Sequence, residues 1–112
     1  MSSQAQHQSL SQGRWFTLSL AEQLANVGSE VVRIARARGD EKRFENAVFR
    51  CLELFDLTIS DTRWRGARLK ELTRVRELLC DAILGGKEYG TTLESLDKYF
   101  YYFAYAARAH RQ

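Results

Sequence analysis

The residues best suited to bind a ligand are the basic side chains between positions 63 and 76. This segment contains six arginines and lysines and one acidic residue, Glu71, in a chain of 112 residues whose formal net charge is +3. Basic side chains contact phosphates, and an indole ring such as that of Trp64 can stack on a base. The segment therefore predicts contact with RNA or DNA, through Arg63, Arg65, Arg68, Lys70 and Arg74.

The same charges also fit a purely structural role. Charged side chains usually cover solvated helix faces, and Trp64 could anchor a protein interface between ion pairs. Arg76 follows the apolar spacing of residues 69–83, so we expect it to be partly buried beside a carboxylate, with Glu30 as a candidate. A second basic cluster, diluted by neighbouring acids, lies around the first predicted turn and comprises Arg33, Arg36, Arg38, Lys42 and Arg43.

The chain offers no recognisable catalytic or cofactor-binding set. Its two histidines, His7 and His110, lie near opposite ends of the sequence, whereas a zinc site needs more ligands at closer spacing. Neither a Gly-rich phosphate loop nor a Gly-x-Ser-x-Gly turn occurs. We therefore expect no enzymatic activity, no cofactor and no metal.

Cysteine usage and hydropathy indicate the compartment. Cys51 and Cys80 are too few for the disulfide framework of a small secreted protein. Free cysteines are usually buried, so we expect both in the core; a redox pair would need the two sulfurs adjacent and accessible. The first residues lack the pattern of a signal peptide, and no segment approaches the roughly 18 unbroken apolar residues of a membrane span. These features favour a cytoplasmic location without membrane contact.

Four amphipathic segments position these side chains. In the first segment, apolar residues recur at spacings of three and four, which is typical of one helix face. They are Leu20, Leu24, Val27, Val31 and Ile34. Similar stripes run through residues 44–59, 69–83 and 93–107. The ends of the segments carry the usual signals for starting and ending a helix. The predicted capping boxes are Ser19-Leu20-Ala21-Glu22 and Thr91-Thr92-Leu93-Glu94, the single caps are Asp40 and Ser60-Asp61, and the glycines that end a helix are Gly39 and Gly85-Gly86.

These segments predict an all-α protein, an antiparallel up-down-up-down four-helix bundle over residues 15–112. Short connections force consecutive helices to run in opposite directions, and the absence of proline suits long helices. Residues 1–14, rich in serine and glutamine, have no apolar period and predict a flexible polar tail. The chain length is typical of one domain.

Three of the predicted helices carry more apolar surface than a single bundle needs. On the fourth, tyrosines fall roughly opposite the stripe of residues 93–107, and tyrosine is enriched at protein interfaces. Phe49 and Leu57 also lie off the core side of the second helix. Self-association would cover this surface, which predicts a homo-oligomer whose interface includes Trp64, Val75, Leu78, Tyr101, Tyr102 and Tyr105. A wide core that takes these flanks into the bundle is the alternative.

Three stretches carry a resemblance to known proteins: Leu18-Ser19-Leu20-Ala21-Glu22-Gln23-Leu24-Ala25-Asn26, Arg63-Trp64-Arg65-Gly66 and Leu69-Lys70-Glu71-Leu72. They resemble a small group of conserved hypothetical bacterial cytosolic proteins, which look like four-helix bundles assembled into a ring of five. The plan is also similar to that of the proteins encoded in 23S rRNA intervening sequences. It is shared by the accessory variability proteins of diversity-generating retroelements, basic pentamers that bind nucleic acid and partner with a reverse transcriptase. The resemblance implies the bundle and the fivefold assembly, and it assigns no activity.

The sequence thus predicts a non-enzymatic homo-oligomer that binds RNA or DNA through a repeated basic surface. The resemblance makes the expected oligomer a pentamer. Repetition of one basic patch around a symmetry axis lets weak contacts act together. The alternative is a structural or adaptor protein that engages a protein partner and has no nucleic-acid role.

Overall fold

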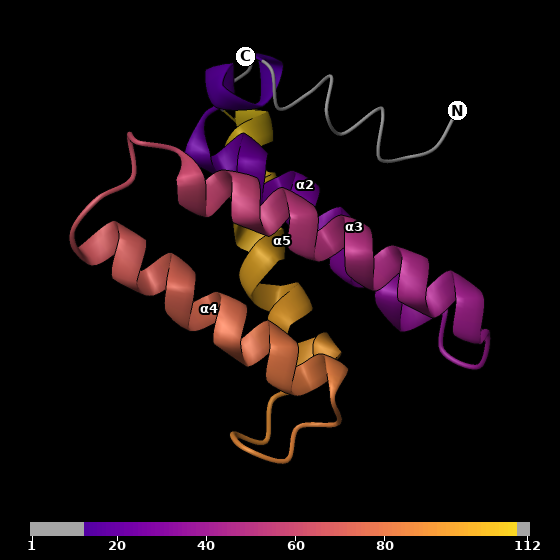
Figure 1. Cartoon of the computed structure of the whole chain (residues 1–112). Coiled ribbons are helices and arrows are strands. Elements are labelled where there is room, and N and C mark those ends of the chain that lie inside the picture. Colours follow the sequence, from indigo (N-terminus) through magenta and orange to yellow (C-terminus); the bar gives the residue numbers. More distant parts are fainter. Residues whose placement is uncertain (1–12, 110–112) are drawn as a thin grey trace.

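The computed structural model describes residues 13–109. These residues form four α-helices after one short 3-10 turn, and they contain no β-strand (Figure 1). The elements are η2 (Trp15–Thr17), α2 (Leu20–Arg36), α3 (Glu41–Ser60), α4 (Ala67–Ile83) and α5 (Leu93–Ala109). The all-α, four-helix prediction is confirmed. Almost all of the predicted tail, residues 1–12, lies outside the described residues, as do both histidines.

The first two helix starts are the ones that the sequence predicts. Ser19 and Glu22 form a reciprocal capping box, because the Ser19 Oγ accepts from the Glu22 amide at 3.1 Å and the Glu22 Oε1 accepts from the Ser19 amide at 3.0 Å. Asp40 caps α3 by accepting a hydrogen bond from the amide of Arg43. Such caps satisfy amide groups that have no acceptor within the helix.

The start of α4 differs from the prediction. Ser60 is the last residue of α3 and Asp61 follows it directly, whereas α4 begins only at Ala67. Asp61 is buried and accepts hydrogen bonds from Gln23 of α2 and from Arg63 in its own loop, so its carboxylate is not available to cap α4. Gly66 takes the cap position instead, with φ at +62°, a left-handed conformation that favours glycine.

The start of α5 is also shifted from the predicted capping box. The hydroxyl of Thr92, not that of Thr91, accepts from the amide of Ser95 at 3.0 Å, and the Ser95 hydroxyl accepts from the Thr92 amide at 3.3 Å. Glu94, the expected reciprocal partner, forms an ion pair with Arg38 at 2.8 Å. That pair connects the start of α5 to the end of α2.

The core is built around α2, which packs against both α3 and α5, while α4 touches its neighbours less closely. Gly28 sets the approach of α5, because a Cβ atom there would lie 2.5 Å from the Cβ of Phe100. Phe100 in turn meets Phe55 of α3 edge to face, with ring centroids 6.2 Å apart. The whole predicted stripe of α2 is buried: Leu20, Leu24, Val27, Val31 and Ile34.

The predicted outer flank of the bundle is only partly at the surface. Val75 is 6% exposed and belongs to the core, so the helical projection that placed it on the flank is wrong for this residue. Trp64 and Leu78 are half-buried against the core. The tyrosines are fully on the surface, between 62% and 68% exposed, at positions Tyr101, Tyr102 and Tyr105.

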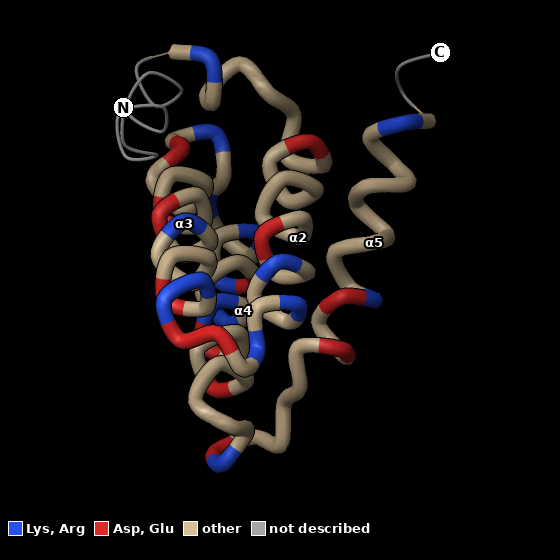
Figure 2. Tube along the Cα trace, turned by 90° about the vertical axis from the view of Figure 1, so that its right-hand side faces the viewer, with Lys and Arg blue, Asp and Glu red and all other residues tan. Residues whose placement is uncertain are grey.

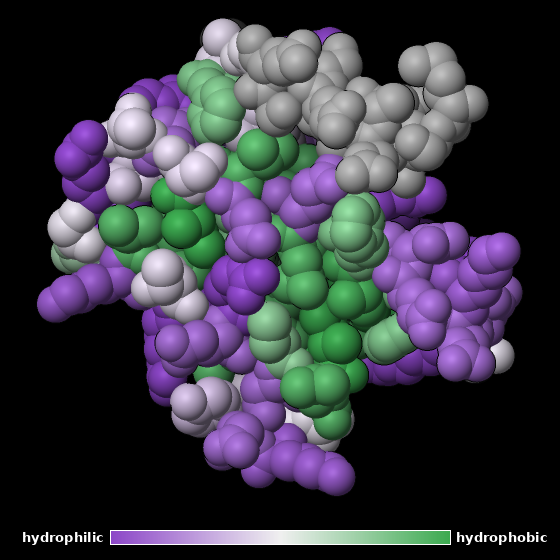
Figure 3. Space-filling view, in the orientation of Figure 1, coloured by the Kyte–Doolittle hydropathy of each residue, from purple (hydrophilic) through white to green (hydrophobic). Residues whose placement is uncertain are grey.

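Apolar surface is also visible between α3 and α4. Figure 3 shows hydrophobic residues gathered across the middle of the face that carries these two helices. Phe49 on α3 is 55% exposed, and Leu84, at the end of α4, is 77% exposed. Among the described helices, none combines the length and the apolar character needed to cross a lipid bilayer.

Candidate nucleic-acid interface

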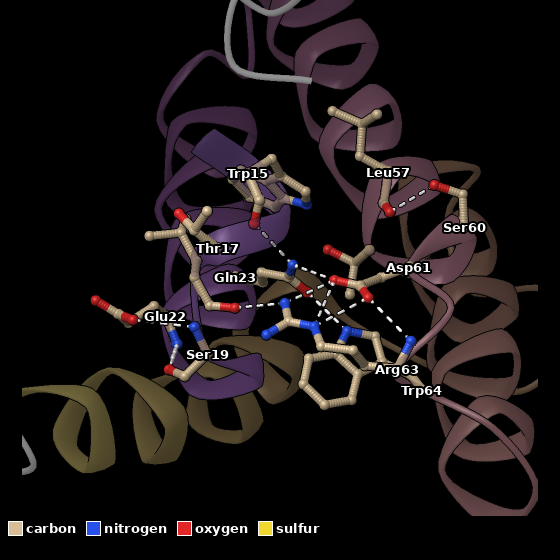
Figure 4. A network of polar contacts seen from close by, with 12 residues as sticks. Trp15, Thr17, Ser19, Glu22, Gln23, Leu57, Ser60, Asp61, Arg63 and Trp64 are labelled. Carbon is tan, nitrogen blue, oxygen red and sulfur yellow. Dashed lines mark hydrogen bonds and ion pairs between the residues drawn. The ribbon is translucent and has the colours of Figure 1, made fainter. Parts of the chain in front are cut away.

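The segment predicted to bind nucleic acid begins in the loop between α3 and α4, beside a buried polar network (Figure 4). Gln23 of α2 is 0% exposed and stands at the centre of this network. Its Nε2 donates to the carbonyl of Trp15 at 3.0 Å and to the Asp61 carboxylate at 2.9 Å. Its Oε1 accepts from the indole Nε1 of Trp64 at 2.9 Å. One amide side chain therefore joins the 3-10 turn, α2 and the loop.

Asp61 and Arg63 form the charged part of the network. The backbone amide of Arg63 donates to Asp61 at 3.0 Å, and its Nη2 donates to the same carboxylate at 2.7 Å. The side-chain hydrogen bond from Arg63 is the main cause that lowers the pKa of Asp61 to about 2, and it acts against desolvation, which raises the pKa. The same Nη2 also donates to the carbonyl of Leu18 at 2.6 Å.

Two predicted interface residues are thus already engaged within the subunit. The guanidinium carbon of Arg63 lies 4.5 Å from the ring centroid of Trp64, which is a cation–π contact. The face and the N–H of Trp64 therefore both have partners. To contact RNA or DNA, Arg63 would have to exchange its hydrogen bonds to Asp61 and Leu18. In this structure these two side chains tie the loop to the start of α2.

The other predicted basic residues, Arg65, Arg68, Lys70 and Arg74, are exposed. Arg65 donates to the carbonyl of Thr62 at 2.8 Å, within its own loop. Arg74 forms an ion pair with Glu77 at 3.5 Å and lies 4.7 Å above the ring of Tyr89. Within the described residues, no ion pair includes Arg65, Arg68 or Lys70. These three cations are the part of the segment that remains open to a phosphate.

The basic residues of α4 are spread around the helix. At about 100° per residue, Lys70 and Arg74 share an outer face with Glu77, whereas Arg68 points roughly the other way. Arg68 is close enough to Tyr99 of α5 for its charge to lower the pKa of that tyrosine. Burial has the larger effect and raises the pKa of Tyr99 to about 12. Figure 2 shows both basic and acidic positions on α3 and α4. The segment is therefore a mixed surface with a basic excess near its start.

Arg76 is partly buried and paired with a carboxylate, as the sequence predicts, but its partner is different. Its Nε donates to Asp56 of α3 at 2.7 Å, which links α4 to α3. Glu30, the candidate partner, instead pairs with Arg33 one helical turn away at 2.9 Å. The prediction erred because Glu30 can reach Arg33 along its own helix without any tertiary contact.

Both cysteines are free, and they differ in burial. Cys51 is 0% exposed, and burial first, then the charge of Glu30, raises the pKa of its thiol to about 12. Cys80 is half-buried, and the Nη1 of Arg76 lies 3.7 Å from its sulfur. The core position predicted for Cys51 is confirmed, whereas Cys80 lies at the core margin. Across residues 13–109, no group of three or more acidic, histidine or cysteine side chains could hold a metal ion.

A second buried carboxylate orders the connection between α4 and α5. Asp81 accepts hydrogen bonds from the amides of Glu88 at 2.8 Å and of Tyr89 and Thr91 at 3.2 Å. Desolvation raises the pKa of Asp81, but these three amides outweigh it, so that the pKa is lowered. The carboxylate accepts the hydrogen bonds of loop amides that have no backbone acceptor in a helix or sheet.

Sequence reasoning missed the roles of Gln23, Asp61 and Asp81. A signal existed for Gln23, because it lies between Leu20 and Val27 at the spacing of the buried stripe. A polar residue at such a position must find hydrogen-bond partners. No comparable signal marks the two aspartates: Asp61 is held by Gln23, distant in sequence, as well as by the neighbouring Arg63, and Asp81 is held by backbone amides seven to ten residues away.

The comparisons with known proteins give no family for this chain. It matches no protein-family model, no curated protein and no solved structure.

Proposed function

We propose that the protein is a non-enzymatic, self-associating helical module that binds RNA or DNA through the start of α4. The observation that carries this proposal is the exposure of Arg65, Arg68 and Lys70 without ion-pair partners among residues 13–109. Phosphate contacts supply most of the affinity of such surfaces, and they need accessible cations. Arg63 supports the site indirectly by fixing the loop that carries Arg65.

The proposal includes a homo-oligomer of antiparallel up-down bundles in the cytoplasm. The exposed tyrosines of α5 support self-association, since residues 99–107 of this helix carry no charge. The short 37–40 connection between α2 and α3 supports opposite directions for consecutive helices. The number five rests on the resemblance alone. Light scattering on the purified full chain tests assembly, and a monomer at high concentration contradicts it.

An anisotropy titration with a structured RNA at 50 and 200 mM salt tests nucleic-acid binding. Three phosphate contacts would give an affinity loss of about 40-fold between these concentrations. Charge reversal of Arg65, Arg68 and Lys70 together is expected to abolish binding, with Arg63 left unchanged so that the loop stays ordered. Lys42→Glu, in the first turn of α3 and so at the opposite end of that helix, is the charge-matched control for the single variant Lys70→Glu. Absence of binding at low salt, or binding indifferent to the triple variant, contradicts the proposal.

The second candidate is an adaptor that engages an acidic protein partner. The exposed aromatic side chains Tyr101, Tyr102 and Tyr105 favour it, because tyrosine is enriched in the contact regions of protein interfaces. Pull-down with and without nuclease separates the candidates. A partner retained after nuclease treatment favours the adaptor, and a partner lost favours nucleic-acid binding.

A further inference from the structure

A second basic region lies where the end of α2 meets the first half of α3. It is a cleft of about 310 Å³ that is open to solvent. Four guanidinium groups and one side-chain amide line it, and no carboxylate does; the lining residues are Arg33, Arg36, Ala37, Arg43, Asn46, Ala47 and Arg50. Cleft volumes near 300 Å³ lie at the lower end of the range for small-ligand sites.

The shape of the cleft follows from the sequence on both helices. On α3, Arg43, Asn46, Ala47 and Arg50 recur at spacings of three, one and three, which places them on one face. Ala37 and Ala47 are buried, at 3% and 5% exposure, and their side chains are single methyl groups. Short side chains at the base and long basic side chains beside them leave a hollow bordered by positive charge.

Most of these cations have no ion-pair partner among the described residues 13–109. Arg33 donates to both oxygens of Glu30, at 2.9 and 3.2 Å. None of the ion pairs among residues 13–109 includes Arg36, Arg43 or Arg50. The Nε of Arg50 is buried and has no hydrogen-bond acceptor in the part of the chain that the structure describes. A buried N–H group without an acceptor is unfavourable, so the Nε of Arg50 gains nothing from its position among the described residues.

We propose that this α2–α3 arginine cleft is a binding site for a phosphate group. Phosphate offers several oxygens in a tetrahedral arrangement, so guanidiniums that approach from two helices can each donate to a different oxygen. Guanidinium groups stay charged throughout the physiological pH range, which keeps the cleft cationic. The site does not depend on the proposed nucleic-acid surface, because the second half of α3 separates its last lining residue, Arg50, from the loop at 61–66 by about 16 Å at 1.5 Å per residue.

Isothermal titration calorimetry of the full chain with pyrophosphate tests the site. Arg36→Gln and Arg43→Gln change exposed residues, so the fold should be retained, which circular dichroism checks. Each is expected to weaken binding about tenfold, since each removes one charge-assisted contact. Lys42→Gln removes the same charge beside Arg43 but does not line the cleft, and it should leave the affinity within about twofold. No saturable binding, or an equal loss in Lys42→Gln, overturns the proposal.

Further titrations identify the source of the phosphate. A nucleoside triphosphate is compared with a short oligonucleotide that carries either a 5′-phosphate or a 5′-hydroxyl. Preference for the triphosphate indicates a free nucleotide, preference for the 5′-phosphate indicates a chain end, and equal binding of both oligonucleotides indicates the phosphodiester backbone. Each of these results supports the cleft only if Arg36→Gln weakens binding of the preferred ligand. Binding that Arg36→Gln leaves unchanged overturns the proposal. The triple variant of Arg65, Arg68 and Lys70 should keep pyrophosphate binding, which separates failure of the α4 surface from failure of the cleft.

Discussion

Replacing Asp61 by Asn tests the buried network beside α4. In the folded protein the pKa of Asp61 is about 2 instead of 3.8, and each pKa unit corresponds to about 1.36 kcal/mol of stability. The difference of nearly two pKa units gives an upper value of about 2.4 kcal/mol for the contribution of the ionised Asp61 to the free energy of unfolding. The side chain of Arg63 is 41% exposed, so solvent screening reduces this value to about 1–2 kcal/mol. We expect Asp61→Asn to lose that amount of stability at pH 7.

The loss should depend on pH in a direction fixed by the lowered pKa. A carboxyl group with a lowered folded-state pKa stabilises the protein fully above its unfolded-state value, and this stabilisation declines as the pH falls toward the folded-state pKa. For Asp61 the window runs from about pH 5 down to pH 2. At pH 3 about half of the difference between the wild type and Asp61→Asn should remain. Urea unfolding between pH 3 and 7 measures it, with Trp15 and Trp64 as fluorescent reporters.

The control is Asp56→Asn, which removes an equally charged carboxylate that pairs with Arg76. The side chain of Asp56 is 60% exposed, and ion pairs at the surface contribute about 0–1 kcal/mol. A pH-independent difference between the wild type and Asp61→Asn, or a loss no larger than that of Asp56→Asn, would refute the reasoning about the network.

Three further predictions concern packing, loop order and thiol reactivity. Gly28→Ala should destabilise the protein by about 1–2 kcal/mol in thermal unfolding, because the new Cβ would overlap the Cβ of Phe100. The higher helix propensity of alanine offsets only part of that cost, and an increase in stability contradicts the prediction. Asp81→Ala should speed hydrogen exchange at the amides of Glu88, Tyr89 and Thr91, which lose their acceptor, and unchanged rates would show another acceptor. In native protein, iodoacetamide should label Cys80 before Cys51, since burial and neighbouring charge raise the pKa of Cys51 to about 12; mass spectrometry reads the order, and equal rates contradict it.

The helices could be predicted from the sequence because their determinants are local. The Ser19–Glu22 capping box and the Asp40 cap involve residues three positions apart, and the apolar stripe of α2 needs only a regular spacing. The start of α4 could not be predicted in the same way. The sequence Ser60-Asp61 has the composition of a cap, but Asp61 is held by Gln23, 38 residues earlier. Asp61 also accepts hydrogen bonds from Arg63, two residues later, so local and tertiary contacts together hold it away from the cap position of α4.

The outer flank of α4 shows a second limit of local patterns. A helical projection separates faces but does not say how deeply a neighbour covers them. Val75 falls beside Leu72 and Leu79 on the buried side once α4 is placed against the bundle, and it is 6% exposed. The tyrosines of α5 were placed correctly at the surface because they lie opposite the buried Leu96 and Phe100. Depth of burial near the edge of a stripe depends on the crossing of the helices, which sequence spacing does not encode.

Tertiary ion pairing separates the arginines into two groups that their sequence positions do not distinguish. Arg38 and Arg76 each hold a carboxylate of another helix, at 2.8 and 2.7 Å, and Arg63 holds Asp61 of its own loop at 2.7 Å and the carbonyl of Leu18 at 2.6 Å. Using one of them to bind a phosphate would break a contact that connects parts of the fold. The cleft arginines Arg36 and Arg43 form no such ion pair within residues 13–109, so a phosphate there costs no existing contact. The local charge excess at 63–76 therefore overstates the capacity of that segment, because Arg63 and Arg76 are already paired with carboxylates.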